Sequence, residues 1–187
     1  MYKKMFNSNK LIGNKYTLNP LTKDDITEEY IAWLNDPIVN RFLEVRYVHQ
    51  TIDTVTEYIN SFYKDQEKYI WGIYSLDGIM IGTISLLEFN RNHNSSAFGL
   101  MIGDSNYWGK SASEESIRLV LNFAFDTLGL HRVSGVCYST NMGMIFTFQR
   151  LGFKREGVMR KSLLDGGKYI DSYQWGVISD EWKNGQR

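Results

Sequence analysis

The segment from Ala97 to Leu128 joins an apolar run to an amphipathic helix pattern through a loop of small residues. The run "AFGLMIGD" is continuously apolar and predicts a strand buried within a sheet. The helix pattern, which begins near Ala112, repeats apolar residues at spacings of four, three and four: Ile117, Leu121, Ala124 and Leu128. The first N–H groups of a helix lack partners and lie at the positive end of its dipole. The segment therefore predicts a buried strand that leads into a helix able to hold an anion, or a helix that is simply well capped.

The rest of the chain predicts a mixed α/β fold. A strand at 11–19 precedes two helices, one over 21–36 with Thr22 as N-cap and one over 51–65. Asp77-Gly78 marks a hairpin, and the tail predicts a second hairpin around 165–167. A strand at 131–139 and a short helix that ends at Gly152 lie between them. This order predicts a mostly antiparallel sheet flanked by helices, in one domain over residues 1–187.

The charge balance, the cysteine and histidine content and the N-terminal segment argue against several classes of function. The 21 basic and 21 acidic side chains cancel, so no overall field recruits nucleic acid or an anionic membrane. Cys137 is the sole cysteine, which favours a cytoplasmic setting and a small buried thiol. The histidines, His49, His93 and His131, are scattered, so no metal site is expected. The N-terminal "MYKKMFNSNK" lacks the apolar core of a signal peptide.

Three stretches together resemble the GNAT family of N-acetyltransferases. They are "FGLMIGDSNYWGKSASEES", "NMGMIFTFQRLGF" and "EGVMRKSLLDGGKYIDSYQWGV". The early "YIAWLNDPIVNRFLE" is also similar to the first helix and substrate-side loop of one branch of the family. That branch holds the ribosomal-protein N-terminal acetyltransferases and many amino-sugar and polyamine acetyltransferases. The likeness extends over nearly the whole chain.

The resemblance implies a V-shaped split between the strands near 97–103 and 132–138, with acetyl-CoA as cosubstrate and no metal. Backbone groups in the split would bind the pantetheine arm, and the N–H of Ile102 or Gly103 would polarise the thioester carbonyl. The resemblance assigns cofactor binding to Met101, Ile102, Gly103, Trp108, Gly109, Lys110, Ser111, Ala112, Ser113, Asn141 and Phe148. Asn141 also has a purely structural interpretation, as the N-cap of the helix that it begins.

The loop at 108–113 departs from the glycine-rich pattern of the family. Ser111 stands where a glycine is usual, and Ser113 replaces another small residue. Ser111 and Glu114 also form a Ser-x-x-Glu capping box, which requires no ligand. A capped helix still presents N–H groups, so the two interpretations are compatible. We expect that glycine at either serine leaves cofactor binding intact or stronger.

The catalytic side chains are less clearly marked. Phe98 and Phe148 occupy the positions where relatives usually carry a glutamate base and a tyrosine acid. Glu88 and His93 are the alternative bases, each of which is equally well explained as a solvated loop residue. The acid role is not assigned to Tyr138, and the leaving thiolate then takes its proton from solvent or from the amine.

The resemblance also assigns substrate selection to the loop after the first helix and to the final hairpin. These segments hold Trp33, Asn40, Arg41, Glu44, Arg46, Tyr169 and Tyr173. Arg41 and Arg46 suit a phosphate or carboxylate, or are ordinary ion-pair partners. The expected activity is direct acetyl transfer to a primary amine, either of a small molecule such as an amino sugar or of a protein N-terminus such as that of a ribosomal protein, in a monomer or homodimer. The alternatives are an acyl-CoA sensor without catalysis and a domain that binds another nucleotide.

Overall fold

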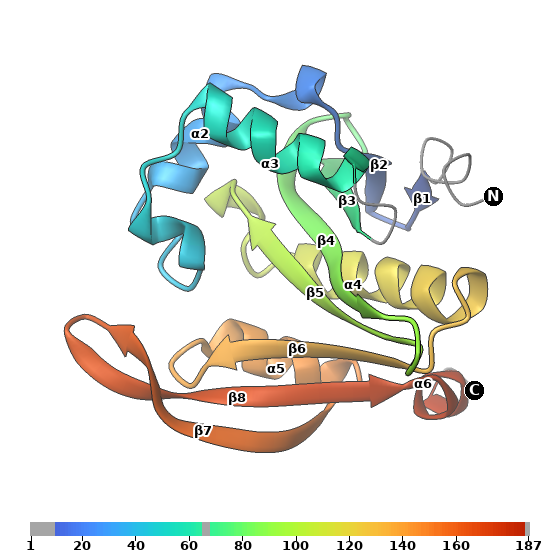
Figure 1. Ribbon diagram of the computed structural model, residues 1–187. Coiled ribbons are helices and arrows are strands. Elements are labelled where there is room, and N and C mark those ends of the chain that lie inside the picture. Colours follow the sequence, from blue (N-terminus) through green and yellow to red (C-terminus); the bar gives the residue numbers. More distant parts are fainter. Residues whose placement is uncertain (1–9, 65–67, 186–187) are drawn as a thin grey trace.

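The computed structural model describes residues 10–64 and 68–185, and its centre is one eight-stranded sheet (Figure 1). The strand order is β1-β2-β3-β4-β5-β6-β8-β7, and every neighbouring pair except β5 and β6 is antiparallel. The strands are β1 (Leu11–Ile12), β2 (Tyr16–Pro20), β3 (Tyr69–Ser75), β4 (Met80–Asn90), β5 (Ser95–Ile102), β6 (Arg132–Tyr138), β7 (Lys154–Asp165) and β8 (Lys168–Ile178). The expected mixed fold with a mostly antiparallel sheet is confirmed.

The two halves of the sheet separate between β5 and β6. These strands pair in parallel only at Ser95–Arg132, Ser96–Val133 and Ala97–Ser134. Beyond Ala97 they diverge, and Figure 1 shows the opening widening toward the end of β5. The predicted V-shaped split is therefore present, and within residues 10–64 and 68–185 no strand lies beside the remainder of β5 on that side.

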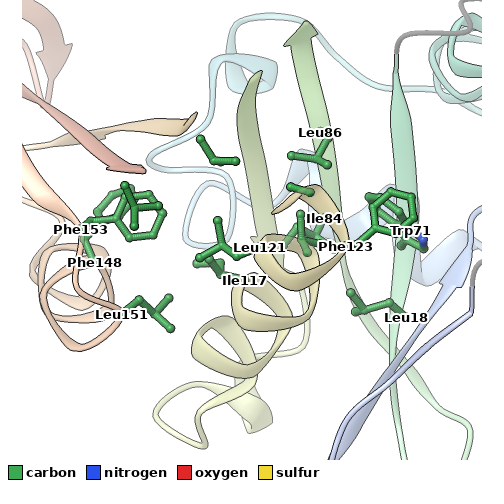
Figure 2. Close-up of a cluster of buried hydrophobic side chains, with 14 of the residues drawn as sticks. Leu18, Trp71, Ile84, Leu86, Ile117, Leu121, Phe123, Phe148, Leu151 and Phe153 are labelled. Carbon is green, nitrogen blue, oxygen red and sulfur yellow. The ribbon is translucent and has the colours of Figure 1, made fainter. Parts of the chain in front are cut away.

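Helices cover both faces of the sheet. α2 (Glu28–Asn35) and α3 (Ile52–Lys64) pack with Ile70 and Met101 on one face. The other face carries α4 (Ala112–Asn122), its π-helical continuation η4 (Phe123–Thr127) and α5 (Met142–Arg150). Figure 2 shows side chains of this second core, with strand residues meeting those of the helices: Leu18, Trp71, Ile84, Leu86, Ile117, Leu121, Phe123, Phe148, Leu151 and Phe153.

Aromatic side chains fill the closed end of the split. Phe148 stacks on Trp175 with ring centroids 5.2 Å apart and lies 4.9 Å from Phe153. A Cβ on Gly135 would come within 2.7 Å of the Phe148 ring, so this strand position requires glycine for space. The helix that borders the split is thereby packed closely against β6.

Several predicted elements differ in their boundaries. The strand at 11–19 is divided into β1 and β2 by a turn. The helix expected over 21–36 is also divided. Thr22 does cap a turn, but only of the 3-10 segment η1 (Lys23–Asp25), and an extended Ile26 intervenes. Thr27 then caps α2 by accepting a bond from the Tyr30 N–H. The two threonines each satisfy local N–H groups, so two short elements replace one helix.

The remaining elements connect or close the fold. They are η2 (Glu44–Tyr47), η3 (Ser105–Tyr107) and α6 (Ser179–Gly185). The helix predicted over 51–65 matches α3, although its last residue lies outside the described part of the chain. Helix α6 follows β8 without a predicted counterpart, and its buried Trp182 donates to the Asn122 side chain at 2.8 Å.

Candidate active site

A cavity of about 780 Å³ opens beside the split. Three segments form its walls: the loop after α2 (residues 37–43), the stretch from the end of β5 to the start of α4, and one side of α5. The size falls within the range of small-molecule and cofactor sites. Among the residues predicted from sequence, those that line it are Arg41, Met101, Ile102, Trp108, Gly109, Ser111, Ala112, Ser113 and Asn141. Lys110, Gly103 and Phe148 are not in this lining.

The end of β5 turns some of its backbone groups toward the split. The Gly103 N–H donates to the Ile81 carbonyl of β4 at 2.8 Å, so the expectation that it is free is wrong. Backbone groups of successive strand residues point to opposite sides. Met101 therefore faces β4 with its backbone, while Leu100 and Ile102 face the split. The Ile102 carbonyl is held there by the Trp108 indole N–H at 2.9 Å. The sequence named Ile102 but not Leu100 among the residues of this strand end, because strand phase is fixed only by the pairing with β4.

The loop before α4 forms a turn that presents backbone N–H groups to the cavity, and we call this turn the cradle. Gly109 and Ser111 both have positive φ, 73° and 66°. The first helical bond runs from the Glu115 N–H to the Ser111 carbonyl at 3.0 Å. The N–H groups of Ala112, Ser113 and Glu114 precede it and have no partner within the helix. These three residues line the cavity, so it ends on free helix N–H groups.

The predicted Ser111–Glu114 capping box does not form. Ser111 adopts the left-handed conformation, and its side chain makes no capping bond. The Glu114 carboxylate instead pairs with Arg118 at 3.3 Å and with Arg150 at 3.1 Å. Two guanidinium groups therefore share one carboxylate beside the cradle, which leaves a net positive charge near the free N–H groups.

Two residues predicted to bind the cofactor belong to α5: Asn141 is its N-cap, and Phe148 lies within it. The Asn141 Oδ1 accepts a bond from the Met144 N–H at 3.1 Å, so Asn141 is a helix N-cap that also lines the cavity. Phe148 is 0% exposed and is enclosed by Phe98, Phe153 and Trp175. A side chain so enclosed does not reach a ligand, and the expected contact of Phe148 with the cofactor is corrected accordingly.

The two candidate bases lie away from the cavity. Glu88 is exposed at a bulge of β4, with φ 52°, and His93 is exposed in the turn between β4 and β5. On β5 this turn adjoins Ser95, whereas the cavity begins at Leu100. Five strand residues cover roughly 16 Å. The structure therefore does not bring Glu88 or His93 to the free backbone groups of the split.

On the acceptor side, two of the predicted residues are structural. Trp33 is 9% exposed and packs directly over Gly103, where an added Cβ would lie 2.1 Å from the indole. Its large ring faces the core because it lies on the buried side of α2. Asn40 is buried and donates from its side chain to the Leu34 carbonyl at 2.8 Å. Both therefore shape the loop after α2, and the expected contact of Trp33 with substrate is corrected.

The loop after α2 is fastened to the final hairpin across the split. Arg41 donates to the Asp165 carboxylate through Nη2 at 3.0 Å, and the Thr140 hydroxyl donates to the same carboxylate at 3.1 Å. Arg46 reaches the carbonyls of Arg41 and Leu164. We refer to these contacts of Arg41, Arg46, Thr140 and Asp165 as the clasp. Tyr169 is 70% exposed at the start of β8, beyond the clasp.

Tyr138 joins the clasp from the end of β6. Its phenol donates to Glu44 at 3.1 Å and accepts from Arg46 at 3.2 Å, and its ring lies 5.4 Å from that of Phe42. Burial and the Glu44 carboxylate raise the pKa of Tyr138, so the phenol is protonated at neutral pH. Sequence reasoning set Tyr138 aside for the acid role and did not foresee this network, which depends on the folded position of the loop.

The described residues contain no helix long and apolar enough to cross a bilayer, nor any group of three or more His, Cys, Asp and Glu side chains arranged for a metal. The cavity, its backbone groups and the helix N-terminus are thus the chemical features that stand out.

The split sheet, the helix cradle and their shared cavity define an acetyltransferase of the GNAT type. The family model for the acetyltransferase (GNAT) domain matches residues 15–154. The chain belongs to this family and is an acyltransferase.

Curated relatives and a solved structure agree with this assignment. The chain is 32% identical over 128 residues to the probable N-acetyltransferase YjcK of Bacillus subtilis (strain 168), covering 68% of this chain and 70% of the relative. It is 22% identical over 173 residues to the spermidine N(1)-acetyltransferase of Vibrio cholerae, covering 92% and 98%. The crystal structure of spermidine N-acetyltransferase from Vibrio cholerae with CoA and spermine has a TM-score of 0.82, 20% identity and coverage of 92% and 100%. At this identity the structural likeness shows the fold.

Proposed function

We propose that the protein transfers the acetyl group of acetyl-CoA directly to the primary amine of a small molecule. The observation that carries this proposal is one cavity with two kinds of donor: the free helix N–H groups at 112–114 and the backbone of β5 at the split. These donors suit the pyrophosphate and the pantetheine arm, respectively, of a single extended ligand. Met101, Trp108, Gly109 and Asn141 complete the proposed cofactor contacts.

Acetyl-CoA would supply an activated acyl group, and the chain would supply orientation and a backbone donor. The Ile102 N–H would stabilise the oxyanion that develops when a neutral amine attacks the thioester, and its location on the side of β5 that faces the split supports this role. The C–N bond forms as the C–S bond breaks, the amine loses a proton and the thiolate gains one. Among the described lining residues no histidine is present, and the one carboxylate, Glu114, is paired with arginines. We infer that water carries these protons.

The acceptor is proposed to be a small amine because relatives named spermidine N(1)-acetyltransferase match almost the whole chain. Arg41, Arg46 and Tyr169 remain candidate acceptor contacts, since Arg41 lines the cavity and Arg46 joins the loop after α2 to the final hairpin, which carries Tyr169. Acetylation of a protein N-terminus, and membership of the ribosomal-protein branch, remain predictions from sequence.

Calorimetry with acetyl-CoA, followed by a thiol-release assay, tests the proposal. The acceptor panel comprises spermidine, glucosamine and a short peptide with a free N-terminus. We expect acetyl-CoA to bind and at least one small amine to release free CoA thiol. Binding without release for any amine would favour a sensor of acyl-CoA, and release with the peptide alone would overturn the proposed acceptor class. Binding of ATP in place of acetyl-CoA would overturn the proposal entirely.

A further inference from the structure

A tyrosine outside the cavity holds the loop that carries the anion cradle. The Tyr16 phenol of β2 donates to the Lys110 carbonyl at 3.0 Å, across a separation of 94 residues. Its ring also meets that of Tyr107 edge to face, with centroids 6.3 Å apart. Burial, with contributions from Glu115 and Tyr107, raises the pKa of Tyr16, so the phenol is a donor throughout the neutral range.

This bond fixes the orientation of one peptide unit. The peptide between Lys110 and Ser111 is trans, because the described chain has no cis peptide bonds. In a trans peptide the C=O and N–H groups point in opposite directions. A carbonyl directed at Tyr16 therefore turns the Ser111 N–H away from β2. Ser111 lines the cavity and neither Tyr16 nor Lys110 is in the described lining, so this N–H is directed to the cradle side.

The same peptide unit is strained on its Ser111 side. Ser111 has φ 66° and ψ 11°, a left-handed conformation that is disfavoured for a residue with a Cβ. Rotating the peptide by half a turn would bring φ to about −114°, a negative value that serine adopts more readily than the left-handed conformation. That rotation would also remove the Ser111 N–H from the cradle and break the bond from Tyr16. The preference of serine for negative φ thus disfavours the peptide orientation that directs the Ser111 N–H to the cradle. The hydrogen bond from Tyr16 stabilises that orientation against the rotation.

Glu115 secures the backbone of Tyr16 from the opposite direction. Its Oε1 accepts from the Lys15 N–H at 2.8 Å and from the Tyr16 N–H at 3.2 Å. A Cβ on Gly13 would come within 2.3 Å of this oxygen, so the glycine leaves room for the carboxylate. The first turn of α4 and the turn between β1 and β2 are thereby joined, and the backbone of Tyr16 is fixed where its phenol reaches the Lys110 carbonyl.

We propose that Tyr16 is a positioning residue for the pyrophosphate loop. Its hydrogen bond keeps the Lys110–Ser111 peptide in the binding orientation. The bond is required because Ser111 stands where glycine is usual. The inference rests on the proposed function, since the cradle is taken to bind the pyrophosphate of CoA. Tyr16 does not touch the ligand and acts through one peptide unit.

A double-mutant cycle with Tyr16→Phe and Ser111→Gly tests this role. Tyr16→Phe retains the ring contact with Tyr107 and removes only the hydroxyl. We expect it to raise the Kd for CoA by about three- to tenfold, as for the loss of one hydrogen bond. In the Ser111→Gly background, where no strain favours rotation, the same change should raise the Kd by less than about twofold.

Tyr63→Phe is a matched control, because the Tyr63 phenol also donates to a backbone carbonyl, that of Leu21 at 2.7 Å, away from the cradle. It should leave the Kd for CoA unchanged. S-acetylpantetheine, which lacks the pyrophosphate, provides a second readout. Tyr16→Phe should raise the KM for acetyl-CoA at nearly constant kcat and leave kcat/KM for S-acetylpantetheine unchanged, whereas a general structural defect would lower both.

The outcomes separate this inference from the proposed function. If the unaltered protein does not bind CoA, the proposed function fails. If it binds CoA and Tyr16→Phe binds equally well, the positioning role is wrong. Equal losses from Tyr16→Phe with and without the Ser111→Gly substitution would also overturn it, because the effect would then not pass through the strained peptide.

Discussion

The two ends of the cavity are built from different materials. The cradle end uses backbone N–H groups at the start of α4, and side chains there serve mainly to hold the loop. The proposed acceptor end uses the clasp, in which Arg41 binds Asp165, Arg46 binds the Leu164 carbonyl, and the Thr140 hydroxyl donates to the same Asp165 carboxylate. Every residue has an N–H except proline, so serine can supply the same N–H as glycine in the cradle, provided that the strained Ser111 backbone is held in place. The proposed acceptor end depends on particular side chains, so we expect a change of one residue there to alter what it recognises.

The packing at the closed end of the split supports both ends of the cavity. We therefore expect the largest loss of stability from a substitution at Phe148. Phe148→Ala removes a 0% exposed ring that packs on Trp175 and Phe153, and should lower the free energy of unfolding by about 3–5 kcal/mol. Chemical denaturation measures this loss. Phe146→Ala, on the same helix but 50% exposed, is the control and should cost less than about 0.5 kcal/mol. Similar losses in the two variants would show that the closed end is not a shared support.

A negative charge introduced at the cradle should weaken cofactor binding without affecting acceptor binding. Ser113→Glu places a carboxylate beside free N–H groups that are proposed to bind pyrophosphate, and should weaken acetyl-CoA binding by at least about tenfold. Ser105→Glu makes the same change at an exposed position outside the described lining and should leave affinity within about twofold. Calorimetry at fixed ionic strength compares them, and equal affinities would place the pyrophosphate elsewhere.

Breaking the clasp should affect the acceptor and leave the cofactor alone. Asp165→Asn removes the charge that Arg41 and Thr140 bind, and should raise the KM of the acceptor amine by about two- to fivefold, the scale of an exposed ion pair. The Kd for acetyl-CoA should not change. A change in that Kd with a constant acceptor KM would reverse the assignment of the two ends.

The clasp also predicts a dependence on pH. Hydrogen bonding from Arg41, opposed by burial, lowers the pKa of Asp165 below its ordinary value. A lowered folded-state pKa stabilises the fold above the unfolded pKa of about 4, and the contribution is lost as pH falls through the folded pKa. Unfolding measured between about pH 2 and 6 should show a shallower acid decline for Asp165→Asn than for the unaltered protein. Identical slopes would show that the carboxylate is not stabilised by the clasp.

The elements at the cradle end could be predicted from sequence because local patterns encode them. A strand, a small-residue loop and an amphipathic helix are contiguous there, and the structure has β5, the loop that holds Gly109 and Ser111, and α4 in that order. The failures arise where distant segments decide the outcome. The pairing of β5 with β4 determines that Ile102, and not Gly103, faces the split. Trp33 packs over Gly103 at the end of β5, and although it lies on the same face of α2 as the buried Tyr30, only the folded arrangement shows which strand end it covers.

The smallest expected effect concerns Glu88 and His93. Both are exposed near the β4–β5 turn, outside the described lining of the cavity. Glu88→Gln and His93→Ala should therefore leave kcat and the acetyl-CoA Kd within about twofold, the usual scale of surface substitutions. A pH–rate profile provides the sharper test, because loss of a general base would remove an ionisation from the profile even where turnover changes little. If either variant loses that ionisation from its pH–rate profile, the proposed acceptor site extends along β4 to the turn. The acceptor site would then contain a catalytic side chain, in contrast to the cradle, which is built from backbone groups.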